Sequence, residues 1–107
     1  MKRGDVVIAL VRGDYGKPRP VVVVQNDRFA GHTSVTVALI TSTLTELDDV
    51  RLTLAPTPEN GLRATSQVQL DRLQSIPRSR LRDVIGHLTP AQMTRINRGL
   101  ALFLGLA

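Results

Sequence analysis

Residues 19–24 read Arg-Pro-Val-Val-Val-Val, and four consecutive valines are typical of a strand that is buried on both faces of a sheet. A second β-branched run, at residues 6–11, precedes it across a polar turn. Residues 33–40 alternate instead, so that Val35, Val37 and Leu39 share one face and predict a strand with one core side. The same reasoning predicts further strands at residues 50–54, 68–77 and 84–88.

The period of the apolar residues changes after residue 88. Thr89, Pro90 and Gln92 form a helix start, in which threonine and glutamine cap each other and proline takes the first helical position. Apolar residues then recur at helical spacing, at Met93, Ile96, Leu100, Phe103 and Leu104. These elements predict a mainly β fold, a small, strongly curved β-barrel with a C-terminal helix. The apolar stripe of that helix is expected to be core or a dimer interface.

Length and composition restrict the class of protein. The chain has 107 residues, which fits one domain over residues 1–107. It has no cysteine and two histidines, which excludes disulfides, cysteine-based metal centres and thiol nucleophiles, and makes a histidine-rich metal site unexpected. No apolar run approaches the ~20 residues that cross a bilayer, and the N-terminus lacks the pattern of a secretory signal. We therefore expect a soluble, cytoplasmic protein that binds no membrane.

The positive charge of the chain is carried mostly by arginine. Fourteen Lys and Arg residues oppose nine Asp and Glu residues, and only Lys2 and Lys17 are lysines. An arginine-rich basic domain suggests a polyanion or an acidic protein segment as partner, although a solvated basic surface explains the composition equally well. Aromatic residues make up 3% of the chain, too few for a base-stacking platform. Phosphate contacts and hydrogen bonds would have to carry most nucleic-acid binding.

Several segments, in this order and spacing, resemble the MazF/PemK family of toxin endoribonucleases. They are residues 2–7 (KRGDVV), 19–27 (RPVVVVQND), 37–42 (VALITS) and 65–71 (TSQVQLD), followed by Ser75 and Ile76. The C-terminal helix also lies where that family has one, so the resemblance spans essentially the whole chain.

The resemblance implies a curved barrel of the CcdB/MazF type, similar in shape to an SH3 barrel, which works as a homodimer. It implies a type II toxin that cleaves single-stranded RNA at a short motif without a metal or cofactor. In this reaction the ribose 2′-OH attacks the phosphate, leaving a 2′,3′-cyclic phosphate and a 5′-hydroxyl. It also implies inhibition by a cognate antitoxin with an acidic flexible segment, and DNA contact only indirectly, through that antitoxin.

The resemblance assigns the catalytic roles to Arg19 and Thr41. Arg19 lies between two prolines at a turn-to-strand boundary and can stabilise charge on the phosphoryl oxygens. Thr41 can donate a hydrogen bond to a non-bridging oxygen, but a hydroxyl is a poor base. Some family members place Arg-x-Asp on the later strand as acid and base, whereas this chain has Gln69 and Asp71 at those positions. Asp71 is predicted either to be the base or only to pair with Arg72 or Arg19.

Four further residues are predicted to contact RNA: Arg12, Lys17, Ser42 and Gln69. The loop from residue 12 to 18 is shorter than in many relatives, which leaves the cleaved motif open. No metal ligands are predicted. We expect His32 to be an exposed loop residue and His87 to be part of a strand.

Two other functions fit the same fold. A CcdB-like toxin would inhibit DNA gyrase and cut no RNA, but the paired Arg19 and Thr41 favour a nuclease. A catalytically inactive relative would bind RNA or an antitoxin-like partner without cleavage, and the glutamine at position 69 keeps this alternative open.

Overall fold

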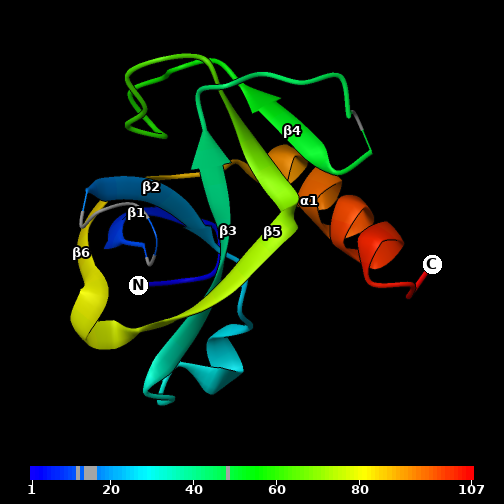
Figure 1. The fold of residues 1–107 in the computed structure, drawn as a ribbon. Coiled ribbons are helices and arrows are strands. Elements are labelled where there is room, and N and C mark those ends of the chain that lie inside the picture. The colour runs from blue at the N-terminus through cyan, green and yellow to red at the C-terminus, as the bar shows by residue number, and fades with distance from the viewer. Residues whose placement is uncertain (12, 14–16, 48) are drawn as a thin grey trace.

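The valine-rich segments form neighbouring strands of one antiparallel sheet in the computed structural model, which describes residues 1–11, 13, 17–47 and 49–107 (Figure 1). The sheet of the described residues has the strand order β4-β5-β3-β2-β1-β6. Its strands are β1 (Asp5–Leu10), β2 (Pro18–Val23), β3 (Ser34–Thr41), β4 (Arg51–Leu54), β5 (Ser66–Pro77) and β6 (Leu81–His87). The mainly β fold is therefore confirmed, and the sheet is curved but open, with β4 and β6 as its two edges.

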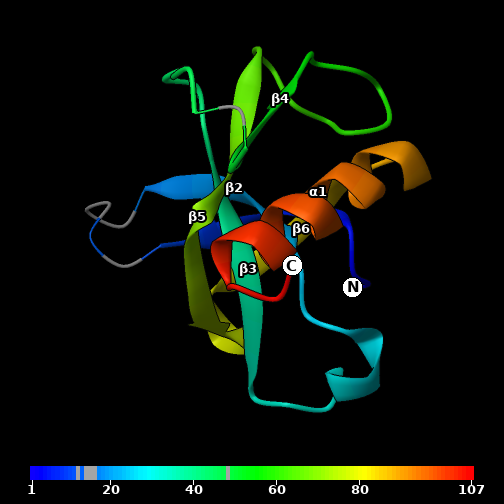
Figure 2. The same cartoon turned by 90° about the vertical axis from the view of Figure 1, so that its right-hand side faces the viewer.

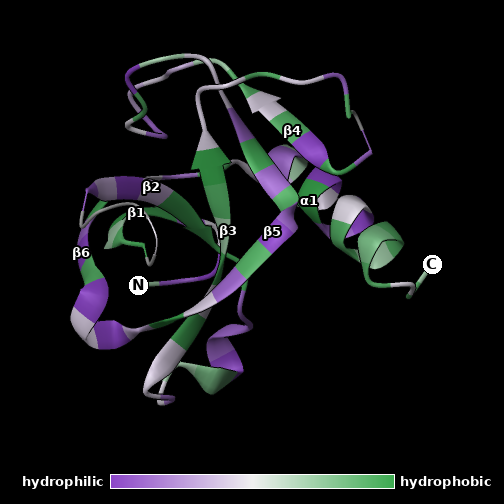
Figure 3. Cartoon of the chain, viewed as in Figure 1, coloured by the Kyte–Doolittle hydropathy of each residue, from purple (hydrophilic) through white to green (hydrophobic). Residues whose placement is uncertain are grey.

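Both faces of the central strands are buried, which explains the unbroken valine run. Val22 belongs to a first core, and its neighbours Val21 and Val23 belong to a second core on the opposite face. The prediction that residues 33–40 have one core side is wrong, because Ala38 and Ile40 are buried in the first core. The C-terminal helix covers that face, since its residue Ile96 belongs to the first core. Figure 3 shows the hydrophobic residues concentrated in these strands.

The C-terminal helix α1 (Pro90–Phe103) covers the first core (Figure 2). Thr89 and Gln92 form the predicted capping box, and Ile96 is fully buried against the sheet. Gly99 lets the helix approach β5, since a Cβ there would lie 2.3 Å from the Cδ1 atom of Leu70. The apolar stripe of the helix extends beyond the core at its C-terminal end, where Phe103 is 48% and Leu104 53% exposed. None of the described helices is long and apolar enough to span a membrane.

Strand β5 bends between the part that pairs with β4 and the part that pairs with residues 34–38 of β3. Leu39 of β3 pairs with Gln69, while the preceding Ala38 pairs with Leu73. Residues 70–72 therefore form a bulge between the partners of two consecutive β3 residues. Asp71 lies in this bulge, so its direction is set by the bend of the strand.

A buried asparagine organises the loop between β4 and β5. Asn60 is 1% exposed, and its side-chain oxygen accepts hydrogen bonds from the backbone N–H groups of Thr57 and Leu62, both at 3.0 Å. Its side-chain nitrogen donates to the carbonyl oxygen of Ala55 at 2.9 Å. The loop is thus held by one side chain that satisfies three backbone groups.

Asn60→Ala is expected to lower the free energy of unfolding by about 2–3 kcal/mol, because buried backbone groups lose their partners. Urea unfolding followed by circular dichroism measures the change. Asn97→Ala is the matched control, because Asn97 is exposed and accepts a single bond from Arg3, and it should cost under about 1 kcal/mol. Equal losses in the two variants would contradict the role given to Asn60.

Candidate functional site

Polar side chains gather on one face of the sheet, where the second core ends. Thr41, Gln67 and Thr53 form one row across β3, β5 and β4. In the next row, Gln69 and Arg51 follow Leu39, which packs against the second core. Because side chains alternate along a strand, both rows face the same side. We call this surface the polar strip, made of Arg19, Thr41, Arg51, Thr53, Gln67, Gln69 and Asp71.

Arg19 reaches the polar strip from β2. It pairs with Ala9, a residue of the second core, and lies two residues before Val21, which belongs to the same core. The β2–β3 register pairs Val21 with Leu39, so continuing that register by two residues sets Arg19 opposite Thr41. Arg19 is exposed and Thr41 is half-buried. The two residues expected to act together therefore share one face at the ends of adjacent strands.

The hydroxyl group of Thr41 has a defined direction. Its oxygen accepts a hydrogen bond from the backbone N–H of Thr43 at 3.1 Å, which leaves the hydroxyl hydrogen available for another acceptor. Gln67, opposite Thr41, binds both the N–H and the carbonyl oxygen of Thr45, at 3.0 and 2.9 Å. These bonds fix the chain that leaves β3. The geometry suits a donor role for Thr41.

Asp71 forms an ion pair with Arg51, whereas the sequence predicted Arg72 or Arg19 as its partner. The Nε and Nη2 atoms of Arg51 donate to the two carboxylate oxygens at 2.8 and 3.1 Å. This hydrogen bonding lowers the pKa of Asp71 below its usual value, against the opposing effect of burial, and the charges of Arg51 and Arg72 lower it further. The partner comes from β4, so only the β4–β5 register could have revealed it.

Asp71→Asn is expected to lower the free energy of unfolding at neutral pH by about 2 kcal/mol, because Arg51 keeps its charge without the paired carboxylate. The folded-state pKa of Asp71 is depressed, so its contribution is complete above the unfolded-state pKa of about 3.9. It is lost as the pH falls through the lower folded-state value. The stability difference between wild type and variant, measured by urea unfolding at several pH values, should therefore shrink below about pH 4. A difference that persists undiminished in acid would contradict this account.

The residues that were predicted to contact RNA do not form one cluster. Gln69 is 8% exposed within the polar strip, and Lys17 is exposed just before β2. Ser42 lines a different cavity of about 410 Å³, beside Pro20, Ile40 and Ser66, whereas Thr41 faces the strip. The side chains of Ser42 and Thr41 therefore do not contribute to the same site. Arg12 lies outside the described residues.

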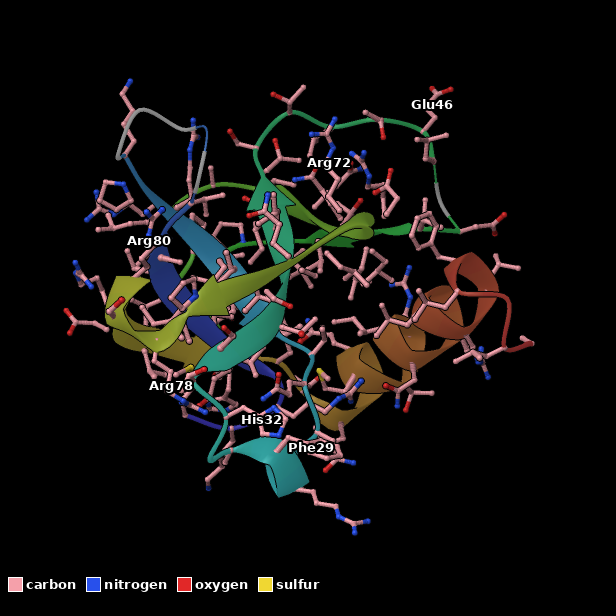
Figure 4. All side chains as sticks on the ribbon, turned by 60° about the horizontal axis from the view of Figure 1, so that its bottom comes forward. Phe29, His32, Glu46, Arg72, Arg78 and Arg80 are labelled. Atoms are coloured by element: carbon pink, nitrogen blue, oxygen red, sulfur yellow. The ribbon has the colours of Figure 1, made fainter. Side chains whose placement is uncertain are left out.

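The two histidines lie away from the polar strip. His32 is exposed and packs edge-on against Phe29, with ring centroids 5.4 Å apart, at the opposite end of the molecule from Arg72 (Figure 4). His87 is the last residue of β6, as predicted. Across residues 1–11, 13, 17–47 and 49–107, no three His, Asp or Glu side chains gather in a way that could hold a metal ion.

The fold is that of solved bacterial toxins. The solved structure of an endoribonuclease in complex with its cognate antitoxin, from a mycobacterial species, matches 100% of this chain and 97% of its own. Its TM-score is 0.84 at 28% identity. The Mycobacterium tuberculosis toxin MazF-mt6 matches 96% of this chain and 98% of its own, with a TM-score of 0.83 at 30% identity.

The chain belongs to the PemK-like, MazF-like toxins of type II toxin–antitoxin systems, because the model of that family matches residues 2–104. It is 43% identical, over 100% of its length and 99% of the relative, to a Mycolicibacterium smegmatis protein named "Probable endoribonuclease MazF". It is 29% identical to endoribonuclease EndoA of Bacillus subtilis, over 99% of this chain and 96% of that protein. The family predicted from the sequence is confirmed.

Proposed function

We propose that this toxin is an endoribonuclease that cleaves single-stranded RNA at a short sequence motif, without a metal ion. The names of the similar proteins support endoribonuclease activity. The observation that carries the assignment of the site is the placement of Arg19 and Thr41 on one face of adjacent strands. An exposed guanidinium group on the same face as a hydroxyl donor is suited to bind a phosphodiester.

In the proposed reaction the ribose 2′-oxygen forms a bond to phosphorus while the bond from phosphorus to the 5′-oxygen breaks. The 2′-hydroxyl loses a proton, and the leaving 5′-oxygen gains one. No metal is needed to generate the nucleophile, because the 2′-hydroxyl is already tethered beside the phosphorus. Arg19 stabilises the negative charge that grows on the phosphoryl oxygens, and Thr41 donates to one of them.

Asp71 is the proposed acceptor of the 2′-hydroxyl proton. Its carboxylate is ionised at neutral pH, as a proton acceptor must be, and its lowered pKa makes it a weaker base than an ordinary aspartate. Its position in the bulge of β5 and its pairing with Arg51 place it on the polar strip. Gln69, which carries no charge, is proposed to form a hydrogen bond with an RNA base or phosphate. Lys17 and Arg12 are proposed to bind phosphates beyond the scissile one.

Two partners are proposed besides RNA. The mycobacterial structure that contains a cognate antitoxin supports inhibition by an antitoxin with an acidic flexible segment, which would compete with RNA for arginine side chains. A homodimer would cover apolar side chains at the end of α1, where Leu102 is 51% and Phe103 48% exposed. The protein would act in the cytoplasm, where its RNA substrate is.

The proposed function is tested by digesting a long RNA with the purified protein in the presence of a chelator, and mapping the new ends. We expect fragments with a 2′,3′-cyclic phosphate and a 5′-hydroxyl that share a short motif at the cut. A DNA supercoiling assay with gyrase, run in parallel, should show no inhibition. Intact RNA, or ends with a 5′-phosphate, would contradict the proposal.

RNA binding is expected to weaken with salt. If about three cationic side chains contact the strand, log K should fall against log salt concentration with a slope near −2. Fluorescence anisotropy with an uncleavable 2′-deoxy-substituted oligonucleotide measures this slope. A flat response would mean that phosphate contacts do not drive binding.

A further inference from the structure

Arg51 is a buried cation at the β4 end of the polar strip. It is 9% exposed overall, and in the β4–β5 ladder it pairs with Gln69, while the residues on either side of it in the two strands face the first core. Its guanidinium group binds the two carboxylate oxygens of Asp71 in a fork, with distances of 2.8 and 3.1 Å. Asp71 itself retains access to solvent, with its side chain 23% exposed.

Stability alone is a weak reason for such a pair. Burying an arginine costs desolvation energy that its ion pair commonly does no more than offset, and apolar residues of similar volume are often at least as stable. The same two strands bury apolar side chains on their other face, where Leu52, Leu54 and Val68 belong to the first core. The arrangement of the pair therefore points to a role at the surface that Asp71 reaches.

We propose that Arg51 is a positioning residue for RNA cleavage, which acts by holding the Asp71 carboxylate in one orientation toward the scissile phosphodiester. This inference rests on the proposed function. Arg51 comes from the edge strand β4, whereas Asp71 lies in the β5 bulge, so the pair also ties the bend of β5 to the sheet.

The fork geometry explains how one residue can orient another without blocking it. Each carboxylate oxygen has two acceptor positions, and the two N–H groups of Arg51 occupy one position on each oxygen. The backbone N–H of Asp71 takes a further position, and the position that is left can accept a hydrogen bond from the 2′-hydroxyl group of a bound nucleotide. A carboxylate held at two points loses rotational freedom about its terminal bond, which favours in-line proton transfer.

The test is a double-mutant cycle on the cleavage rate and on binding. Arg51→Met and Asp71→Asn, each alone, are expected to lower kcat by at least about 10-fold for a short RNA that carries the cut motif. Binding of the 2′-deoxy-substituted oligonucleotide should change by less than about 3-fold, because neither residue is assigned to bind phosphate. The double variant should have the kcat of Asp71→Asn within about 2-fold, since Arg51 acts only through Asp71.

Arg82→Met is the matched control, because Arg82 is exposed on β6, at the opposite edge of the sheet from β4, and should keep the wild-type kcat. Arg51→Lys keeps the charge but not the fork, and should have an intermediate kcat. If Arg51→Met does not fold, Arg51→Lys and the double variant still decide the question. The double variant removes both charges together, so no unpaired ion is left buried.

Failure of this inference can be distinguished from failure of the proposed function. Wild-type protein that leaves RNA intact refutes the proposed function itself. Wild-type cleavage, together with a lowered kcat in Asp71→Asn and a wild-type kcat in folded Arg51→Met, overturns the inference alone. A wild-type kcat in folded Asp71→Asn removes Asp71 as the proton acceptor and overturns the inference with it. Losses that multiply in the double variant overturn it as well, because Arg51 would then act independently of Asp71.

Discussion

Arg19→Ala is expected to lower the rate of RNA cleavage by about 10²–10³-fold, the usual loss when one preorganised donor to a developing oxyanion is removed. The guanidinium group lies at the start of β2, where Pro18 and Pro20 restrict the backbone on both sides. A donor on a restricted backbone needs less reorganisation as charge builds up on the phosphate, so its contribution is expected mainly in kcat. Single-turnover cleavage of a labelled RNA oligonucleotide measures the effect.

The control for this variant is Arg28→Ala. Arg28 is an exposed arginine in the 3₁₀ turn Asp27–Phe29, at the opposite end of the strands from the polar strip, so it removes the same charge without touching the site. Its cleavage rate should stay within about 3-fold of wild type, because a distant exposed charge is largely screened by salt. Folded Arg19→Ala protein with nearly wild-type activity would refute the assignment of Arg19.

Thr41→Val is expected to lower the cleavage rate by about 10- to 100-fold, since a hydrogen bond to a charged group contributes about 1.5–3 kcal/mol. Valine keeps the β-branched shape at the end of β3, so packing changes little. The backbone N–H of Thr43 loses its bond to the threonine hydroxyl, but it lies in an exposed segment and water can replace that partner.

Thr41→Ser separates the hydroxyl group from the methyl group. It should retain most of the activity, because the oxygen and its bond to the N–H of Thr43 are kept. Circular dichroism and the melting temperature check that both variants fold. Equal losses in Thr41→Ser and Thr41→Val would show that the methyl group, and not the hydroxyl, carries the effect.

Local sequence patterns were sufficient to predict the strands and the helix. The valine run predicted β2 because only a strand buried on both faces accommodates four consecutive valines, and the capping box at Thr89 and Gln92 located the start of α1. Alternation was misleading for β3, where Ala38 and Ile40 belong to a core that is completed by the packing of α1 on that face. Periodicity describes one strand at a time and contains no information about the layer above it.

The candidate site was predicted less completely, because its geometry depends on strand register. The resemblance supplied Arg19 and Thr41, and the ladder places them on one face. Arg72 or Arg19 was predicted as the partner of Asp71, but its ion pair in the structure is with Arg51, which is 20 residues away in sequence and reaches it across the β4–β5 ladder. Ser42 was predicted to bind RNA near its neighbour Thr41, but the two side chains face different sides of the sheet at the end of the strand.

The central claim is that the RNA cuts itself through its own 2′-hydroxyl group, assisted by Arg19 and Thr41. The most direct measurement compares two oligonucleotides that carry the cut motif, one all-ribose and one with a single 2′-deoxy nucleotide on the 5′ side of the scissile bond. We predict that the deoxy substitution abolishes cleavage and leaves the dissociation constant within about 3-fold, because the lost hydroxyl is the nucleophile and not an anchor. Cleavage of both oligonucleotides at similar rates would show that water or another group attacks the phosphorus, and would contradict the mechanism.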